Sequence, residues 1–275
     1  MRWKRPLLWI VAVVTTATAC GGPSHSAARP DGTARGAASG SPAPDRAKAR
    51  AGAPAPQRSA APSAGLPSVG VLLDEDGHWC TASVVDSPRG NVVATAAHCV
   101  FADGSASSGF SFAPGYRGTG AKRTPYGTWK VRTVQVADAW KAAGDDADAH
   151  DYAFLTLAPD GRGRQVQDVV GAARPDWASG PERRVTVVGY PNKEHNPADG
   201  PVSCTTDTRR DPDLSGSMLM ECDGFFDGTS GSPWLAAGRL IGVLSGGETD
   251  TESTAVLFDA RTRALFDRAV KAAAT

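Results

Sequence analysis

The sequence of 275 residues lacks an excess of either charge, since 29 Lys and Arg side chains stand against 29 Asp and Glu. Nucleic-acid binders usually carry a clear basic excess, so this balance argues against that class, and we expect no nucleic-acid partner. The charges are distributed unevenly: residues 1–65 hold nine basic and two acidic side chains, and residues 66–275 hold 20 and 27. A basic N-terminal segment, residues 1–65, therefore precedes a mildly acidic segment, residues 66–275.

Residues 1–20 lack an apolar run long enough to cross a bilayer. Three basic residues precede a mostly apolar stretch of 14 residues, 6–19, whereas a membrane-spanning helix needs about 20. A positive start, a short apolar run and small residues before Cys20 are typical of an export signal. The segment around Cys20 resembles a bacterial lipoprotein processing site, where this Cys becomes the lipidated first residue; ordinary signal cleavage is the alternative. We expect a protein that is secreted, or anchored by lipid on the outer face of a bacterial membrane.

Residues 21–65 contain no Leu, Ile, Val, Met or aromatic side chain, and 28 of these 45 residues are Ala, Pro or Gly. Such a segment buries too little apolar surface to offset the entropy lost on ordering its backbone. We therefore predict a disordered linker, which a protease can also remove. The folded domain is expected in residues 66–275.

Cysteine is scarce, and beyond Cys20 the four remaining residues form two close pairs, Cys80 with Cys99 and Cys204 with Cys222. An even set in an exported protein indicates disulfides, although four cysteines allow three connectivities and the sequence does not choose among them. Pairing within each close pair closes a loop of about 20 residues, worth about 3 kcal/mol. The tight Cys and His spacing of a zinc site is missing, so we expect no metal.

Residues 66–275 have the sequence pattern of an all-β fold. Short runs rich in Val, Thr and Leu alternate with Gly, Pro, Asp and Asn, as expected for strands and their turns. The predicted strands are Val69–Leu73, Thr81–Val85, Asn91–Ala96, Trp129–Val136, Tyr152–Leu157, Val185–Val188, Met218–Glu221, Arg239–Leu244 and Ala255–Phe258. Helical periodicity is convincing only at 260–273, where Leu265, Phe266 and Val270 share one face.

Three segments carry residues suited to nucleophilic catalysis. Thr95-Ala96-Ala97-His98-Cys99 ends an apolar strand, Asp151 opens another, and Gly228-Thr229-Ser230-Gly231-Ser232-Pro233 forms a glycine-rich turn. Serine needs an adjacent base to accept its proton, and a buried carboxylate holds the imidazole in the correct tautomer. Each segment alone is explained by ordinary structure, but together they predict a His98, Asp151 and Ser230 triad. Asp148 is the competing carboxylate, and it lacks a following strand.

In this order, the three segments resemble the chymotrypsin-fold serine peptidases, in particular their bacterial trypsin-like and V8-like branch. The resemblance covers about residues 66–258. It implies two six-stranded antiparallel β-barrels, at about 66–160 and 180–260, with a crossover within 162–181. The C-terminal helix at 260–273 is predicted from its periodicity alone. His98 and Asp151 would come from the first barrel and Ser230 from the second.

The implied activity is that of a serine endopeptidase that hydrolyses peptide bonds through an acyl-enzyme, without a metal or organic cofactor. The N–H groups of Gly228 and Ser230 would form an oxyanion hole, where each donor is worth about 3 kcal/mol. The family also pairs the Cys after the catalytic His with a Cys at the distance of Cys80. We expect a monomer that acts on peptide or protein substrates.

The resemblance assigns substrate binding to Ser245, Gly246 and Gly247, which look like the strand that pairs with the substrate backbone. Gly224 stands where trypsins carry a pocket-floor Asp in an ungapped count, and Asp227 is near enough to favour a basic side chain. Leu244 occupies the position of the pocket His in Glu-selective relatives, which disfavours Glu preference. Thr229 replaces the Asp that pairs with a new N-terminus in the trypsin branch, so activation by that ion pair is not expected.

Two alternatives remain open from the sequence. A catalytically silent homologue would use the same cleft to bind peptides or act as an adhesion module, and the aromatic pair Phe225 and Phe226 would obstruct its pocket. The acidic run Asp145-Asp146-Ala147-Asp148 is a solvated loop or, less simply, a calcium site. His78 and His195 have no evident partner and are expected at the surface.

Overall fold

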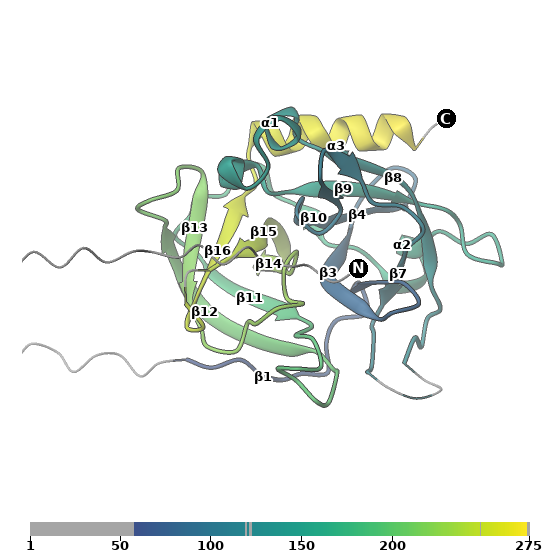
Figure 1. The fold of residues 1–275 in the computed structure, drawn as a ribbon, viewed down its shortest axis with the longest axis horizontal. Helices are drawn as coiled ribbons and strands as arrows, with labels where there is room; N and C mark the ends of the chain where they lie inside the picture. The colour runs from purple at the N-terminus through teal and green to yellow at the C-terminus, as the bar shows by residue number, and fades with distance from the viewer. Residues whose placement is uncertain (1–57, 119, 121–122, 248, 274–275) are drawn as a thin grey trace, which may run out of the picture. The chain divides into compact units, whose positions relative to one another are not determined.

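The computed structural model describes residues 58–118, 120, 123–247 and 249–273. This part of the chain forms two closed six-stranded antiparallel barrels followed by a C-terminal helix (Figure 1). The predicted export signal, Cys20 and the linker up to residue 57 lie outside the described residues. No helix within the described ranges is long and apolar enough to cross a membrane.

The first barrel closes in the strand order β2-β3-β4-β9-β8-β7. Its strands are short and rich in β-branched residues, which pack well on a pleated and half-buried surface. They are β2 (Val69–Leu73), β3 (His78–Val85), β4 (Val92–Thr95), β7 (Ser111–Pro114), β8 (Trp129–Val136) and β9 (Ala153–Leu157). Strands β4 and β9 are buried along their whole length, and they end and begin beside His98 and Asp151.

The second barrel has the order β12-β11-β14-β15-β16-β13 and closes through pairing of β13 with β12. Its strands are β11 (Arg184–Gly189), β12 (Val202–Arg210), β13 (Ser217–Glu221), β14 (Pro233–Ala236), β15 (Arg239–Gly246) and β16 (Glu252–Leu257). The turn that carries Ser230 connects β13 to β14, the strand next to β15. The expectation of two six-stranded antiparallel barrels is confirmed.

Three barrel strands, β7, β12 and β14, were not among the strands predicted from the sequence. Strand β12 is the clearest case, since its sequence, Val-Ser-Cys-Thr-Thr-Asp-Thr-Arg-Arg, contains one large aliphatic residue. Alternate residues Cys204, Thr206 and Thr208 nevertheless face inward and are buried. Small polar side chains fill this part of the barrel because their hydroxyls find partners, such as Thr208 Oγ1 with the carbonyl of Arg183.

Smaller elements decorate the connections between the barrel strands. They are β1 (Ala61–Pro62), β5 (Phe101–Ala102), β6 (Ser105–Ala106), α1 (Asp138–Ala143), the 3₁₀ helix η1 (Gly144–His150), α2 (Val166–Val170) and β10 (Arg174–Pro175). Helix α2 and strand β10 lie in the crossover between the barrels. Helix α1 and η1 precede Asp151 and form one wall of the candidate active site described below.

Helix α3 (Ala260–Ala272) follows the last strand of the second barrel and packs on β8 and β9 of the first (Figure 1). Asp259 caps its start, accepting from the N–H groups of Arg261 and Thr262, while the Thr262 hydroxyl accepts from the Asp259 N–H. This reciprocal capping box satisfies backbone donors that a helix start leaves free. Phe266 meets Phe154 edge to face at 5.5 Å, so the helix ties the end of the chain to the first barrel.

The described chain begins inside the segment assigned above to the linker, and residues 58–65 run along the second barrel. β1 pairs with β12, and the Ala60 N–H donates to the carbonyl of Asp223 at 2.7 Å. The carbonyl of Arg58 accepts from the Asp223 N–H at 2.9 Å. Backbone pairing of this kind needs no apolar side chain, which is why composition alone placed the domain boundary at residue 66.

Both local cysteine pairs are disulfides in the structure, Cys80–Cys99 and Cys204–Cys222. The first joins β3 to the residue after His98. The second joins β12 to the residue after β13 in the other barrel. Each disulfide therefore closes a loop within one barrel and leaves the contact between barrels to non-covalent packing.

Candidate active site

His98 lies just beyond the end of β4 and makes two hydrogen bonds to one carboxylate. Its backbone N–H donates to Asp151 Oδ1 at 2.8 Å, and its ring Nδ1 lies 2.7 Å from Asp151 Oδ2. Because an ionised carboxylate only accepts, Nδ1 carries the proton and Nε2 is left as the free acceptor. The side chain is 34% exposed, so one edge of the ring faces the cleft.

Asp151 is 2% exposed and takes hydrogen bonds from both barrels. Besides His98, its Oδ2 accepts from the hydroxyl of Ser245 on β15 at 2.6 Å. Burying a carboxylate is costly unless donors compensate for the lost water, and three donors do so here. Ser245, which the sequence analysis assigned to substrate binding, therefore also orients the carboxylate.

The pKa of His98 is raised above its ordinary value of 6.5. Burial lowers the pKa, but the hydrogen bond to Asp151 and the negative charges of Asp151 and Asp145 together outweigh burial. An imidazole with this pKa accepts a proton readily near neutral pH, as a general base must.

Ser230 sits in a turn held against the first barrel by its own backbone. Its carbonyl accepts from the Thr81 N–H at 2.8 Å, and the next N–H, that of Gly231, donates to the carbonyl of Leu244 at 2.7 Å. Gly231 has φ +82, and a Cβ on it would stand 2.2 Å from the carbonyl oxygen of Thr81. Only glycine permits this close approach between the serine turn and the first barrel.

The N–H groups of Gly228 and Ser230 donate to no acceptor within the described part of the chain. Gly228 has φ +96 and its carbonyl accepts from the Thr81 hydroxyl at 2.9 Å, which sets the orientation of the turn. The intervening N–H of Thr229 is used internally, since it donates to the carbonyl of Phe226. The N–H groups on either side of Thr229, those of Gly228 and of Ser230 itself, are therefore left without an acceptor among the described residues.

No hydrogen bond joins Ser230 Oγ to His98 among the described residues. Hydrogen bonds between catalytic groups are often long in unliganded enzymes and tighten when substrate binds. The two residues line neighbouring cavities that share Gly246, Gly247 and Glu252. His98 and Ser230 thus line adjacent cavities although they come from different barrels.

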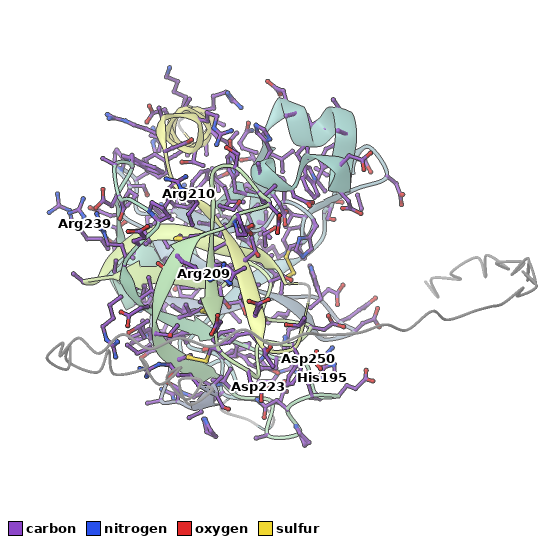
Figure 2. The ribbon with its side chains drawn as sticks, turned by 90° about the vertical axis from the view of Figure 1, so that its left-hand side faces the viewer. His195, Arg209, Arg210, Asp223, Arg239 and Asp250 are labelled. Atoms are coloured by element: carbon purple, nitrogen blue, oxygen red, sulfur yellow. A yellow bond between two sulfur atoms is a disulfide. The ribbon has the colours of Figure 1, made fainter. Side chains whose placement is uncertain are left out.

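The cavity beside Ser230 has a volume of about 350 Å³ and includes Phe225, Phe226 and Asp227. Two more of its residues, His195 and Asp250, lie close together in Figure 2. Gly224, one of the predicted pocket residues, lines neither cavity, and a Cβ on it would meet Ala60 at 3.3 Å. The aromatic pair forms a wall of the cavity, which stays open.

The second cavity, of about 520 Å³, begins at His98 and Ser245 and extends away from Ser230. Its walls come from α1 and η1 on the first barrel and from the β12–β13 connection and β16 on the second. No sequence motif pointed to the β12–β13 connection, because its residues become neighbours of His98 only when the two barrels pack together.

The ligand atoms of Cys80, His98 and Cys99 lie within 4.8 Å of one another, the spacing of a metal site. Both sulfurs are consumed in the disulfide, so neither is available as a thiolate ligand. This group of residues does not suit a metal.

His78 was expected at the surface, and that expectation is wrong. Its side chain is 4% exposed, and its Nε2 lies 2.8 Å from Asp199 Oδ1, while the Tyr116 hydroxyl donates to Asp199 Oδ2 at 2.9 Å. Asp199 follows His78 by 121 residues, so nothing local in the sequence indicated this partner. His195, the other histidine expected at the surface, is exposed. Its ring stacks on Phe226, with the ring centroids 4.7 Å apart.

Comparison with known proteins agrees with this geometry. Residues 70–243 match the family model described as a trypsin-like peptidase domain. Among curated proteins, no sequence matches the chain significantly.

Solved structures of bacterial and other microbial proteases share the fold. The protease Anisep from Arthrobacter nicotinovorans superposes with a TM-score of 0.68 at 20% identity, covering 76% of this chain and 98% of its own. The thermostable serine protease AL20 from an extremophilic microorganism gives 0.65 at 27% identity, over 74% and 97% of the two chains. A Glu endopeptidase solved in complex with MPD gives 0.64 at 17% identity, over 80% and 99%. With the family model matching more than half of its length, this chain belongs to the trypsin-like peptidase family, in the chymotrypsin fold.

Proposed function

We propose that this protein is an exported serine endopeptidase that hydrolyses peptide bonds through an acyl-enzyme intermediate. The observation that carries the proposal is the paired contact of His98 with the buried Asp151, 2.7 Å from ring Nδ1 to carboxylate. That contact leaves Nε2 free as a base, in a cavity that adjoins the one lined by Ser230. Membership of the trypsin-like peptidase family supports the reaction class.

In the proposed first step, Ser230 Oγ attacks the substrate carbonyl carbon and passes its proton to His98 Nε2. Asp151 keeps its negative charge, holds the ring in the required tautomer and stabilises the imidazolium. The carbonyl oxygen becomes an oxyanion, which accepts from the N–H groups of Gly228 and Ser230. His98 then protonates the leaving amine, the C–N bond breaks, and an ester to Ser230 remains.

In the second step, water takes the place of the departed amine. His98 Nε2 removes a proton from the water, whose oxygen attacks the ester carbonyl. The second oxyanion collapses, the ester bond breaks and the proton on His98 returns to Ser230 Oγ. The products are a carboxylic acid and the regenerated enzyme, with no net change in any side chain.

Substrate placement follows from the two cavities. We propose that the substrate backbone preceding the cleaved bond pairs with the end of β15, at Ser245 and Gly246, and with Gly247, the residue after the strand. The side chain of the substrate residue directly before the cleaved bond then enters the 350 Å³ cavity beside Ser230, where it lies against Phe225 and Phe226. Asp227 lines the same cavity, whereas the position of Gly224 gives no support for a role in binding.

Export is part of the same proposal, with Cys20 as the lipidated residue. A Cys20→Ala variant expressed in the native cell should lose incorporation of a labelled fatty acid and should appear in the medium. A wild type that incorporates no labelled fatty acid would contradict the anchor and leave ordinary secretion as the route.

The direct test of catalysis is labelling of the purified exported protein with a fluorophosphonate probe, which reacts with activated serines. We expect the wild type to be labelled, the Ser230→Ala variant to be unlabelled, and Ser108→Ala, a change at an exposed serine, to behave as wild type. A folded wild type that stays unlabelled would contradict the proposal and favour a silent homologue that only binds peptides.

A further inference from the structure

The 520 Å³ cavity next to His98 is strongly acidic. Six carboxylates line it, against one guanidinium, that of Arg209, which is labelled in Figure 2. The carboxylates come from both barrels: Asp145, Asp148, Asp151, Asp211, Asp213 and Glu252.

Half of these carboxylates already have partners. Asp151 is bonded to His98, and Glu252 lies 3.1 Å from Arg209. Asp211 accepts from two backbone N–H groups of its own turn and from the Thr254 hydroxyl.

The other three carboxylates, Asp145, Asp148 and Asp213, have no side-chain hydrogen bond or ion pair within the described residues. Asp145 and Asp148 lie on η1 of the first barrel, and Asp213 lies on the β12–β13 connection of the second. The uncompensated negative charge therefore faces the cavity from both sides.

Crowding of like charges is visible at Asp148. Its pKa is raised by partial burial and by the negative charges of Asp151, Asp145 and Asp146. A cation entering the cavity would relieve this repulsion, since an opposite charge within about 4–6 Å favours the ionised carboxylate.

A second feature of the cavity is independent of the charges. Trp140 of α1 lines it and is 3% exposed, yet its indole N–H has no acceptor within the described residues. A buried donor without a partner is unfavourable by about 1–3 kcal/mol, so native structures rarely leave one unless a ligand or water completes it. The indole nitrogen is itself buried, so the carbonyl of a bound peptide reaches it only if the side chains around it move.

We propose that this acidic cavity is a specificity subsite that binds lysine or arginine side chains of the substrate on the amino-terminal side of the cleaved bond. The inference rests on the proposed function, because the cavity shares Ser245, Gly246 and Gly247 with the strand edge assigned to the substrate backbone. Substrate residues that precede the one in the smaller cavity then lie between η1 and the β12–β13 connection. The substrate class is basic polypeptides, with selectivity set away from the cleaved bond.

The test compares two peptides that differ only in the two residues before the one at the cleaved bond, Lys-Lys against Gln-Gln. With the full exported chain we expect kcat/KM to favour the basic peptide by about fivefold for each lysine, the range of a well-placed ion pair. The preference should fall in high salt, because the screening length shrinks from about 10 Å at 0.1 M to about 3 Å at 1 M.

The Asp145→Asn, Asp213→Asn double variant should bring the two kcat/KM values within about twofold of each other, since it removes two of the unpaired charges. Asp267→Asn, a change at an exposed position on α3, is the matched control and should keep the preference. Equal cleavage of both peptides by the wild type, or an unchanged preference in the double variant, would overturn the subsite.

Failure of the subsite and failure of the proposed function give different results. Binding of the two peptides to the Ser230→Ala protein, followed by fluorescence anisotropy, needs no catalysis. Tighter binding of the Lys-Lys peptide supports the subsite even where the fluorophosphonate test fails. Equal binding overturns the subsite even where Ser230 is labelled.

Discussion

Asp199→Ala should destabilise the folded domain far more than its place in a loop suggests. The Asp199 side chain is fully buried and is contacted by His78 from β3, by Tyr116 after β7 and, at 3.5 Å, by the Lys193 ammonium. Truncation to Ala leaves the Tyr116 hydroxyl and the His78 N–H without an acceptor. At about 1–3 kcal/mol for each buried donor, the free energy of unfolding falls by about 2–6 kcal/mol.

The backbone at Asp199 adds a separate term, because its φ is +53 and Ala adopts this region less readily than Asp. Asp103 supplies the matched control, since its φ is +52 and its side chain is exposed. Asp103→Ala should therefore show the backbone effect alone, about 1 kcal/mol. The assay is urea unfolding followed by tryptophan fluorescence with the disulfides intact. Equal losses in the two variants would refute the reasoning, because the buried network would then contribute nothing.

The hydrogen bond between Tyr116 and Asp199 also changes the pKa of Tyr116. Burial, the hydrogen bond to Asp199 and its negative charge raise the pKa of Tyr116 from 10.0 to about 12. A pKa that is higher in the folded state gives stability that is complete below about pH 10 and is lost as pH rises toward 12. Asp199→Asn should lower this pKa, as measured by tyrosinate absorbance and assigned with Tyr116→Phe. An unchanged Tyr116 pKa in the variant would contradict the assigned contact.

Three further predictions concern the site and the start of the domain. Ser245→Ala removes one of the donors to Asp151 and should lower kcat at least about tenfold, since a hydrogen bond to a charged group is worth about 1.5–3 kcal/mol; an unchanged kcat would refute this. Because His98 must be neutral to act as a base and its pKa is raised, kcat/KM should rise with pH through a midpoint above 6.5. Asp145→Asn removes a negative charge that raises this pKa and should move the midpoint to lower pH. A shift of the midpoint to higher pH would contradict the assigned charge effect. A chain that begins at Arg58 should keep its melting temperature and activity. A chain that begins at Leu66 should melt at a lower temperature, because it loses hydrogen bonds such as Ala60 N–H to Asp223 and Ser63 N–H to Pro201. Equal melting temperatures would show that residues 58–65 add no stability.

How far the sequence predicts this fold depends on the strand. β4 and β9 are apolar except for one Thr in each, so their pattern marked them clearly. β12 is polar and was missed, because its inward Thr side chains are acceptable only where neighbouring strands supply hydrogen-bond partners. β7 is four residues long and ends in Pro114, a residue that weakens a strand prediction.

The candidate site also contains residues that the sequence indicated and contacts that it did not. His98, Asp151 and Ser230 could be proposed as a triad from the sequence because each lies in a short contiguous segment whose residue types suit one chemistry. The hydrogen bond from Ser245 to Asp151 spans 94 residues and two barrels, so no local pattern contains it. The pairing of His78 with Asp199 escaped detection for the same reason.

By itself, the sequence determined the all-β class, the helix that begins after Asp259 and the residue types able to carry out acyl transfer. These depend on local periodicity, capping and motif chemistry, which neighbouring residues specify. Only the tertiary structure decided which surfaces meet: the Ser230 turn on Thr81, the residues of barrel two that join η1 in an acidic cavity, and the strand at residues 61–62. These contacts join segments far apart in the chain, and their charge and burial arise only once both barrels have closed.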